Sequence, residues 1–113
     1  MTETEIKELK ALNLVYPHFV FYRVKGKAYF NFPQAVVYHS PDGMEFGYRG
    51  SGPADAALNI LLYFVNGEDA LRMHQEFKEI FIATLPEVGG VIDEDDIDRW
   101  IDAWMVLNKG GSI

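Results

Sequence analysis

The first half of the chain is rich in aromatic and β-branched residues interrupted by polar ones, which is typical of β-strands. Two strands are expected at residues 18–24 and 27–32, joined by a tight turn at Gly26. Shorter strands are expected at residues 36–39 and 45–48, because the Ser-Pro-Asp-Gly sequence between them has the residues of a β-turn. The pattern thus predicts a hairpin followed by two short strands.

Apolar residues in the second half recur at the three- and four-residue spacing of helices. Helices are expected at residues 53–65, 68–85 and 94–108. The first is apolar around nearly its whole circumference, so it is predicted to be buried on most sides. A short amphipathic helix is also expected at residues 3–12, within an N-terminal helical extension that covers residues 1–16.

This order of elements predicts an α+β fold in one domain, residues 1–113. A small antiparallel sheet of three or four strands is expected to pack against the buried central helix and two further helices. Gly89 and Gly90 are expected in a loop between the last two helices. The chain length fits a single domain, and no internal repeat or linker divides it.

The Gly-Ser-Gly-Pro turn before the central helix admits two interpretations. In the structural one, Gly52 is the N-cap, Pro53 is the first helical residue and Asp55 is the third. The carboxylate of Asp55 would then occupy the positive end of the helix, where a phosphate could otherwise bind. In the other, the turn contacts a small molecule or nucleotide, although the lysine of a phosphate-binding loop is missing. The candidate ligand contacts in that case are Arg49, Ser51, Gly52, Asn59 and Tyr63.

Acidic residues are concentrated near the C-terminal end. The chain has a net charge of −7, and residues 87–102 carry seven acids and one arginine, a charge of −6. Acids stabilise the first turn of a helix, but Asp98 and Asp102 lie beyond it, four residues apart, where like charges cost ~0.2–0.5 kcal/mol. With Asp95 they form an acidic stripe, which is either a solvated face or a binding face for a partner with a basic surface. This charge argues against binding to the backbone of nucleic acids.

The expected hairpin has a small basic tip. Arg23, Lys25 and Lys27 surround its turn, next to Tyr22 and Tyr29. Basic residues at such a place commonly protect a sheet edge from aggregation. Basic and aromatic residues together also bind single-stranded nucleic acids, so that alternative stays open.

The three histidines do not form a recognisable catalytic or metal-binding pattern. The residues one helical turn from His74 cannot ligate a metal. His39, Ser40 and Asp42 suggest a hydrolytic set, but residues of one tight turn rarely point at one another. No catalytic residue, metal ligand or cofactor is therefore assigned.

The composition bounds the class of protein. The chain has no cysteine, which excludes disulfides, thiol catalysis and cysteine-based metal sites. About half of the residues are apolar, as in globular proteins, yet no apolar run approaches the ~20 residues of a membrane span. The N-terminal residues lack the pattern of a signal peptide. A cytoplasmic protein without membrane contact is expected.

The stretch HSPDGMEFGYRGSGPADAALNILL, His39–Leu62, resembles the core of an uncharacterised family of small phage, plasmid and prokaryotic proteins. The shared features are a turn like Ser-Pro-Asp-Gly, an aromatic-Gly-Tyr sequence, Gly-Ser-Gly-Pro-Ala and a helix rich in alanine and leucine. Weaker similarity at Phe77–Leu85 and Ile97–Ile101 extends the resemblance to about two-thirds of the chain. Phe46 stands where the family commonly has tryptophan. The family has no established activity, so the resemblance implies a mobile genetic element and supplies no catalytic residues.

These observations predict a non-enzymatic binding protein of a mobile genetic element, which acts by protein–protein contact. A specific form of this hypothesis is that the acidic stripe inhibits a host defence complex. A small-molecule or nucleotide-binding protein that uses the Gly-Ser-Gly-Pro turn is the alternative, and a small hydrolase with His39 and Asp42 is a distant third. The sequence leaves open whether the protein forms a homodimer.

Overall fold

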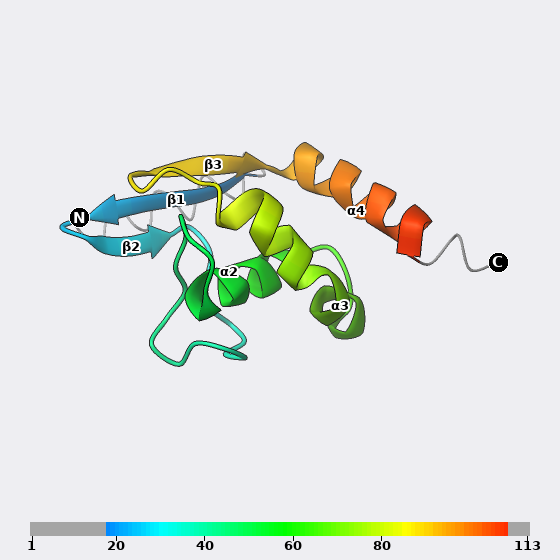
Figure 1. The fold of residues 1–113 in the computed structure, drawn as a ribbon, viewed down its shortest axis with the longest axis horizontal. Coiled ribbons are helices and arrows are strands. Elements are labelled where there is room, and N and C mark those ends of the chain that lie inside the picture. The colour runs from blue at the N-terminus through cyan, green and yellow to red at the C-terminus, as the bar shows by residue number, and fades with distance from the viewer. Residues whose placement is uncertain (1–17, 109–113) are drawn as a thin grey trace.

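A three-stranded antiparallel sheet lies against a set of helices in the computed structural model, which describes residues 18–108 (Figure 1). This arrangement confirms the α+β fold. The helix expected at residues 3–12 lies outside the described residues. The elements in chain order are β1 (His18–Val24), β2 (Lys27–Phe30), α2 (Ser51–Leu61), α3 (Gly67–Phe77), the π-helix η1 (Lys78–Ile82), β3 (Gly89–Asp93) and α4 (Glu94–Asn108).

The strands are ordered β2-β1-β3, and both pairs are antiparallel. The expected hairpin is confirmed, and its turn places Lys25 and Gly26 at positive φ (50° and 79°), as a two-residue hairpin turn requires. The prediction of a loop at Gly89 and Gly90 is wrong, because both residues belong to β3 and pair with β1. Gly89 lies opposite Tyr22, at a φ of 120° that favours glycine.

The strands expected at residues 36–39 and 45–48 do not form. Both segments belong to a long irregular loop, residues 31–50. The first part of this loop runs along the side of α2 away from the sheet (Figure 1). The second part returns to the sheet, where the ring of Phe46 meets those of Phe21 and Phe30 at centroid distances of 5.6 and 6.0 Å. The backbone of Val36 is bonded to the side chain of Asn59 instead of to a strand: its N–H donates to Oδ1 and its C=O accepts from Nδ2, each at 2.8 Å. A helix side chain thus takes the place of the missing neighbouring strand.

The core lies between the inner face of the sheet and α2. Phe19 and Phe21 on β1 point inward, and their rings contact Phe32 edge-on at centroid distances of 5.4 and 5.6 Å. Every residue of α2 after Ser51 is buried, which confirms the prediction of a buried central helix. The helix begins two residues earlier than expected and ends at Leu61.

The remaining helices pack on α2 and on one another. The helix expected over residues 68–85 is instead an α-helix followed by the π-helix η1. The ring of Trp100 on α4 contacts Phe77 and Phe81 at centroid distances of 5.4 and 6.1 Å, which holds α4 to α3 and η1. None of the helices within residues 18–108 is long and apolar enough to cross a membrane.

Candidate functional site

The carboxylate of Asp55 does not cap its own helix, so this part of the structural interpretation is wrong. Because α2 begins at Ser51 after the N-cap Gly50, Asp55 lies in the second turn and points sideways. The residue is fully buried and accepts hydrogen bonds from the backbone N–H groups of three consecutive residues in the 31–50 loop. The donors are Tyr38 (3.2 Å), His39 (2.9 Å) and Ser40 (2.9 Å). Asp55 therefore anchors the loop on the helix.

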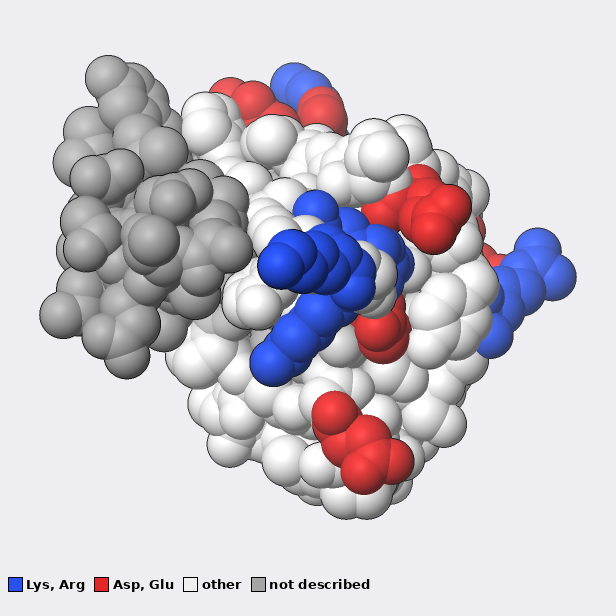
Figure 2. All heavy atoms as spheres, turned by 90° about the vertical axis from the view of Figure 1, so that its left-hand side faces the viewer, with Lys and Arg blue, Asp and Glu red and all other residues white. Residues whose placement is uncertain are grey.

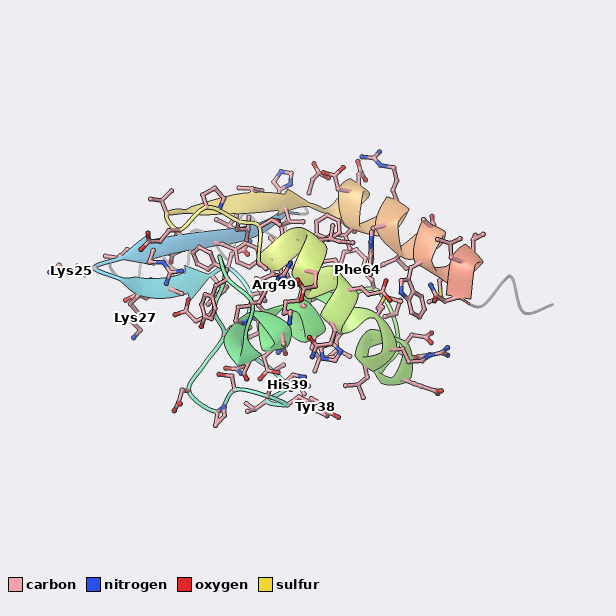
Figure 3. All side chains as sticks on the ribbon, viewed as in Figure 1. Lys25, Lys27, Tyr38, His39, Arg49 and Phe64 are labelled. Carbon is pink, nitrogen blue, oxygen red and sulfur yellow. The ribbon has the colours of Figure 1, made fainter. Side chains whose placement is uncertain are left out.

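The five candidate ligand contacts do not surround one site. Arg49 is exposed and forms an ion pair with Glu79 (Nε–Oε2, 2.6 Å; Arg49 is labelled in Figure 3). Ser51 is also exposed, whereas Asn59, about 12 Å along the helix axis, is buried and bonded to Val36 and to the carbonyl of Asp55.

The other two candidates have structural environments of their own. Gly52 is buried so closely that an added Cβ would lie 2.7 Å from Cβ of Glu45. Tyr63 is half exposed, and its ring meets that of Phe19 at a centroid distance of 5.6 Å. Asn59 and Tyr63 line one cavity of about 230 Å³, but Arg49, Ser51 and Gly52 do not line it. A ligand site that uses all five residues therefore stays a prediction from sequence.

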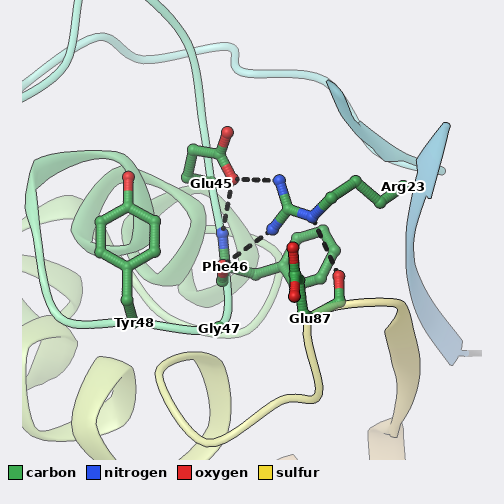
Figure 4. Close-up of a pocket in the computed structure, with 6 residues that line it drawn as sticks. All are labelled: Arg23, Glu45, Phe46, Gly47, Tyr48 and Glu87. Atoms are coloured by element: carbon green, nitrogen blue, oxygen red, sulfur yellow. Dashed lines mark hydrogen bonds and ion pairs between the residues drawn. The ribbon is translucent and has the colours of Figure 1, made fainter. Parts of the chain in front are cut away.

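A cavity of about 360 Å³ lies beside the aromatic-Gly-Tyr sequence (Figure 4). Its wall contains the guanidinium of Arg23, which donates to the carbonyls of Glu87 (2.9 Å) and Phe46 (3.1 Å) and to Oε1 of Glu45 (3.0 Å). The same guanidinium lies over the Phe46 ring, 4.3 Å from its centroid. Arg23 thus ties β1 to two loops and does not offer its charge to a ligand.

Replacing Arg23 by lysine is expected to lower the free energy of unfolding by about 1–2 kcal/mol. A lysine ammonium cannot reach three acceptors with a planar fork or stack on Phe46 in the same way. Urea denaturation would measure the change. The matched control is Arg49→Lys, whose guanidinium is exposed and makes one ion pair. Equal stability of the two variants would contradict the assigned role.

The acidic stripe on α4 faces solvent, as its spacing predicts. Asp95, Asp98 and Asp102 are all exposed, on the side of the helix opposite the buried Ile97 and Ile101. Their carboxylates make no hydrogen bond or ion pair with any residue in the described range 18–108. The arginine on this helix, Arg99, is paired with Asp96 instead. No positive side chain in this part of the chain therefore pairs with the stripe.

Basic side chains gather at the other end of the molecule. Figure 2 looks onto the hairpin end, where lysine and arginine side chains lie together near the centre of the view, with acidic side chains elsewhere on the same face. Lys25 and Lys27 are exposed there, and both are labelled at the end of the ribbon remote from α4 in Figure 3. Within residues 18–108, two exposed lysines thus lie at the end remote from the acidic stripe on α4.

The sequence did not predict a contact between two histidines. Nε2 of His39, in the 31–50 loop, lies 2.9 Å from Nε2 of His74 on α3. Helical spacing around His74 could not reveal a partner 35 positions away on an irregular loop. No hydrogen bond joins the side chain of His39 to that of Ser40 or Asp42 within residues 18–108, so the hydrolytic set is not assembled there. The same residues contain no group of three or more metal-ligating side chains.

Comparison with known proteins gives one match. The sequence model of a family of unknown function (DUF6166) matches residues 17–103, which include all the described strands and almost all of the described helices. No curated protein and no solved structure matches the chain.

Proposed function

The chain belongs to this family of unknown function, DUF6166, and we propose that it is a non-enzymatic binding protein that engages a basic protein partner through the acidic stripe on α4. The observation that carries the proposal is that three aligned carboxylates are exposed without compensation from residues 18–108. Asp98 and Asp102 lie beyond the first turn, four residues apart, where like charges oppose helix formation, and a basic partner would relieve this repulsion.

The surface around the stripe has the further parts of an interface. Asp95, Asp98, Asp102 and Val106 follow one another at three- and four-residue intervals and so lie on one side of α4. Val106 is 66% exposed, and Leu107 beside it is 80% exposed. An apolar contact next to charged groups is the usual composition of a protein–protein interface. A partner with lysines or arginines along one face and an apolar group at its end fits this surface.

The positions of the exposed charges also favour binding of a basic partner at α4. A basic partner is repelled by Lys25 and Lys27 at the hairpin and attracted by α4 at the remote end (Figure 3). Electrostatic complementarity of this kind raises the rate of association and fixes the orientation of the complex. The interaction is expected to weaken as salt screens the exposed charges.

The biological setting is part of the proposal. The resemblance of His39–Leu62 to small phage and plasmid proteins supports an origin in a mobile genetic element that acts in the host cytoplasm. Proteins that grip nucleic acids present basic surfaces, and an acidic helix competes for such surfaces. A basic component of a host defence complex is therefore the proposed target.

A pull-down from host lysate tests the function. The variant with Asp95, Asp98 and Asp102 all changed to serine is expected to capture at least about tenfold less of the partner, since close charge pairs contribute on the order of 1 kcal/mol or more each. The matched control changes three exposed acids elsewhere, Asp42→Ser, Glu76→Ser and Glu87→Ser, and so alters the net charge equally. Capture of every partner by the α4 variant would contradict the proposal.

A further inference from the structure

The histidine pair joins the 31–50 loop to α3 through one hydrogen bond. The Nε2 atoms of His39 and His74 are 2.9 Å apart, the ring centroids are 5.1 Å apart and the ring planes differ by 22°. The centroid separation exceeds the nitrogen separation by nearly twice the distance from the centre of an imidazole ring to its nitrogen. This is the separation expected when both nitrogens lie on the line that joins the two ring centres. The two nitrogens therefore face each other head-on, as in an N–H···N hydrogen bond. Two ligands of a zinc ion would instead direct their lone pairs at a third point, about 2.0 Å from each nitrogen.

The position of the shared proton follows from a second contact. Nδ1 of His74 lies 2.6 Å from the carbonyl oxygen of Leu71. A carbonyl only accepts, so Nδ1 of His74 carries a proton and, in the neutral ring, Nε2 has the free lone pair. His39 must then donate from its own Nε2. The bond holds one proton between the two rings, and a proton added to Nε2 of His74 while His39 keeps its Nε2 proton would place two donors against each other.

The surroundings of His74 disfavour that added proton. His74 is 5% exposed, and its burial lowers its pKa below the ordinary value of about 6.5. The bond to the Leu71 carbonyl and the charge of Asp55 on α2 act in the opposite direction on this pKa. His39 on the loop and Lys78 on η1 add to the lowering. The net direction keeps His74 neutral when the loop is docked.

We propose that His39 and His74 form a proton-controlled latch that holds Val36–Ser40 on the body of the protein and releases it on acidification. The closed latch tolerates one added proton, on Nδ1 of His39, because Nε2 of that ring still donates. It does not tolerate a second added proton, because Nε2 of both rings would then carry a proton and two N–H donors would face each other. Opening withdraws the loop N–H groups from Asp55 and frees a segment whose Val37 and Tyr38 side chains are already more than half exposed.

The direction of the pH effect follows from the lowered pKa of His74. The open state binds the extra proton more readily than the closed state does, so the closed state is fully stabilised above about pH 6.5. That stabilisation is lost as the pH falls from 6.5 through the lower pKa of the closed form. The latch therefore holds the loop more firmly at neutral pH than in mild acid.

Two measurements on the full chain test the latch. Imidazole ¹⁵N shifts at pH 7.5 are expected to show His74 with its proton on Nδ1 and His39 with its proton on Nε2. Amide hydrogen exchange at Tyr38, His39 and Ser40, corrected for intrinsic rates, is expected to lose roughly tenfold protection between pH 7.5 and 5.5, since one pH unit changes a linked equilibrium up to tenfold.

The variants separate protonation of the pair from general acid effects. His74→Gln keeps an oxygen that accepts from His39 but cannot take up a proton, so the extra loss of protection in acid should disappear. His18→Gln removes the other described histidine, which lies in β1, and should leave the loss unchanged. A proton on Nε2 of His74 at pH 7.5, or equal acid sensitivity in His74→Gln and the unmodified chain, would overturn the proposal.

Discussion

Replacing Asp55 by alanine is expected to lower the free energy of unfolding by about 3–5 kcal/mol. The carboxylate is fully buried and accepts from three backbone N–H groups and from Nε2 of Gln34 at 3.1 Å. Hydrogen bonds to a carboxylate are among the stronger ones, and its removal leaves several donors beside α2 without their acceptor. Equilibrium denaturation in urea would measure the loss.

The matched control is Asp98→Ala. The side chain of this aspartate is exposed on α4 and makes no hydrogen bond or ion pair within the described residues, so the stability should change by less than about 0.5 kcal/mol. Amide exchange in Asp55→Ala should also rise first at Tyr38, His39 and Ser40, the three residues that lose their acceptor. A loss below about 1 kcal/mol in Asp55→Ala would mean that the loop is held in another way.

Gly89→Ala is expected to cost at least about 3 kcal/mol and to disrupt the pairing of β3 with β1. Gly89 has a φ of 120°, and an added Cβ would lie 2.1 Å from the backbone oxygen of Phe21. Both atoms belong to paired strands, so neither can move without breaking the sheet. Thermal unfolding and the amide signals of β1 would report the change.

Gly67→Ala provides the contrast. An added Cβ at Gly67 meets no atom within 4 Å, and the residue begins α3. Alanine there should leave the stability unchanged or raise it by up to about 1 kcal/mol, because it reduces the freedom of the unfolded chain and favours the helix. Similar stabilities of Gly67→Ala and Gly89→Ala would contradict the described geometry of β3.

Local patterns predicted the elements whose contacts are local. The hairpin follows from its aromatic strands and from Gly26 in the turn, and the burial of α2 follows from its apolar circumference. The exposed stripe at Asp95, Asp98 and Asp102 follows from helical spacing. In each case the determining residues lie within two turns or one hairpin of each other.

The errors concern contacts between distant segments. The two glycines at the start of β3 are typical of a loop, and only the close approach of Phe21 explains why a strand requires Gly89. The polar residues Asp55 and Asn59 on α2 mark the side that receives the 31–50 loop, which the sequence alone could not distinguish from a ligand-binding or solvated side. The bond between His39 and His74 depends on the same loop and was missed for the same reason.

The surface of α4 is the feature on which the proposed function depends, because the family has no known function. The family match shows a domain of unknown function and names no partner or reaction. The proposed function therefore depends on whether a partner buries the exposed carboxylates or they remain in water.

Carboxyl footprinting of the protein in complex with its captured host partner decides this most directly. Carbodiimide labelling followed by mass spectrometry measures the accessibility of each aspartate and glutamate in the free and bound states. The account predicts that labelling of Asp95, Asp98 and Asp102 falls strongly in the complex, while that of Asp42 and Glu76 stays as it is in the free protein. Undiminished labelling of all three α4 aspartates in a stable complex would contradict it.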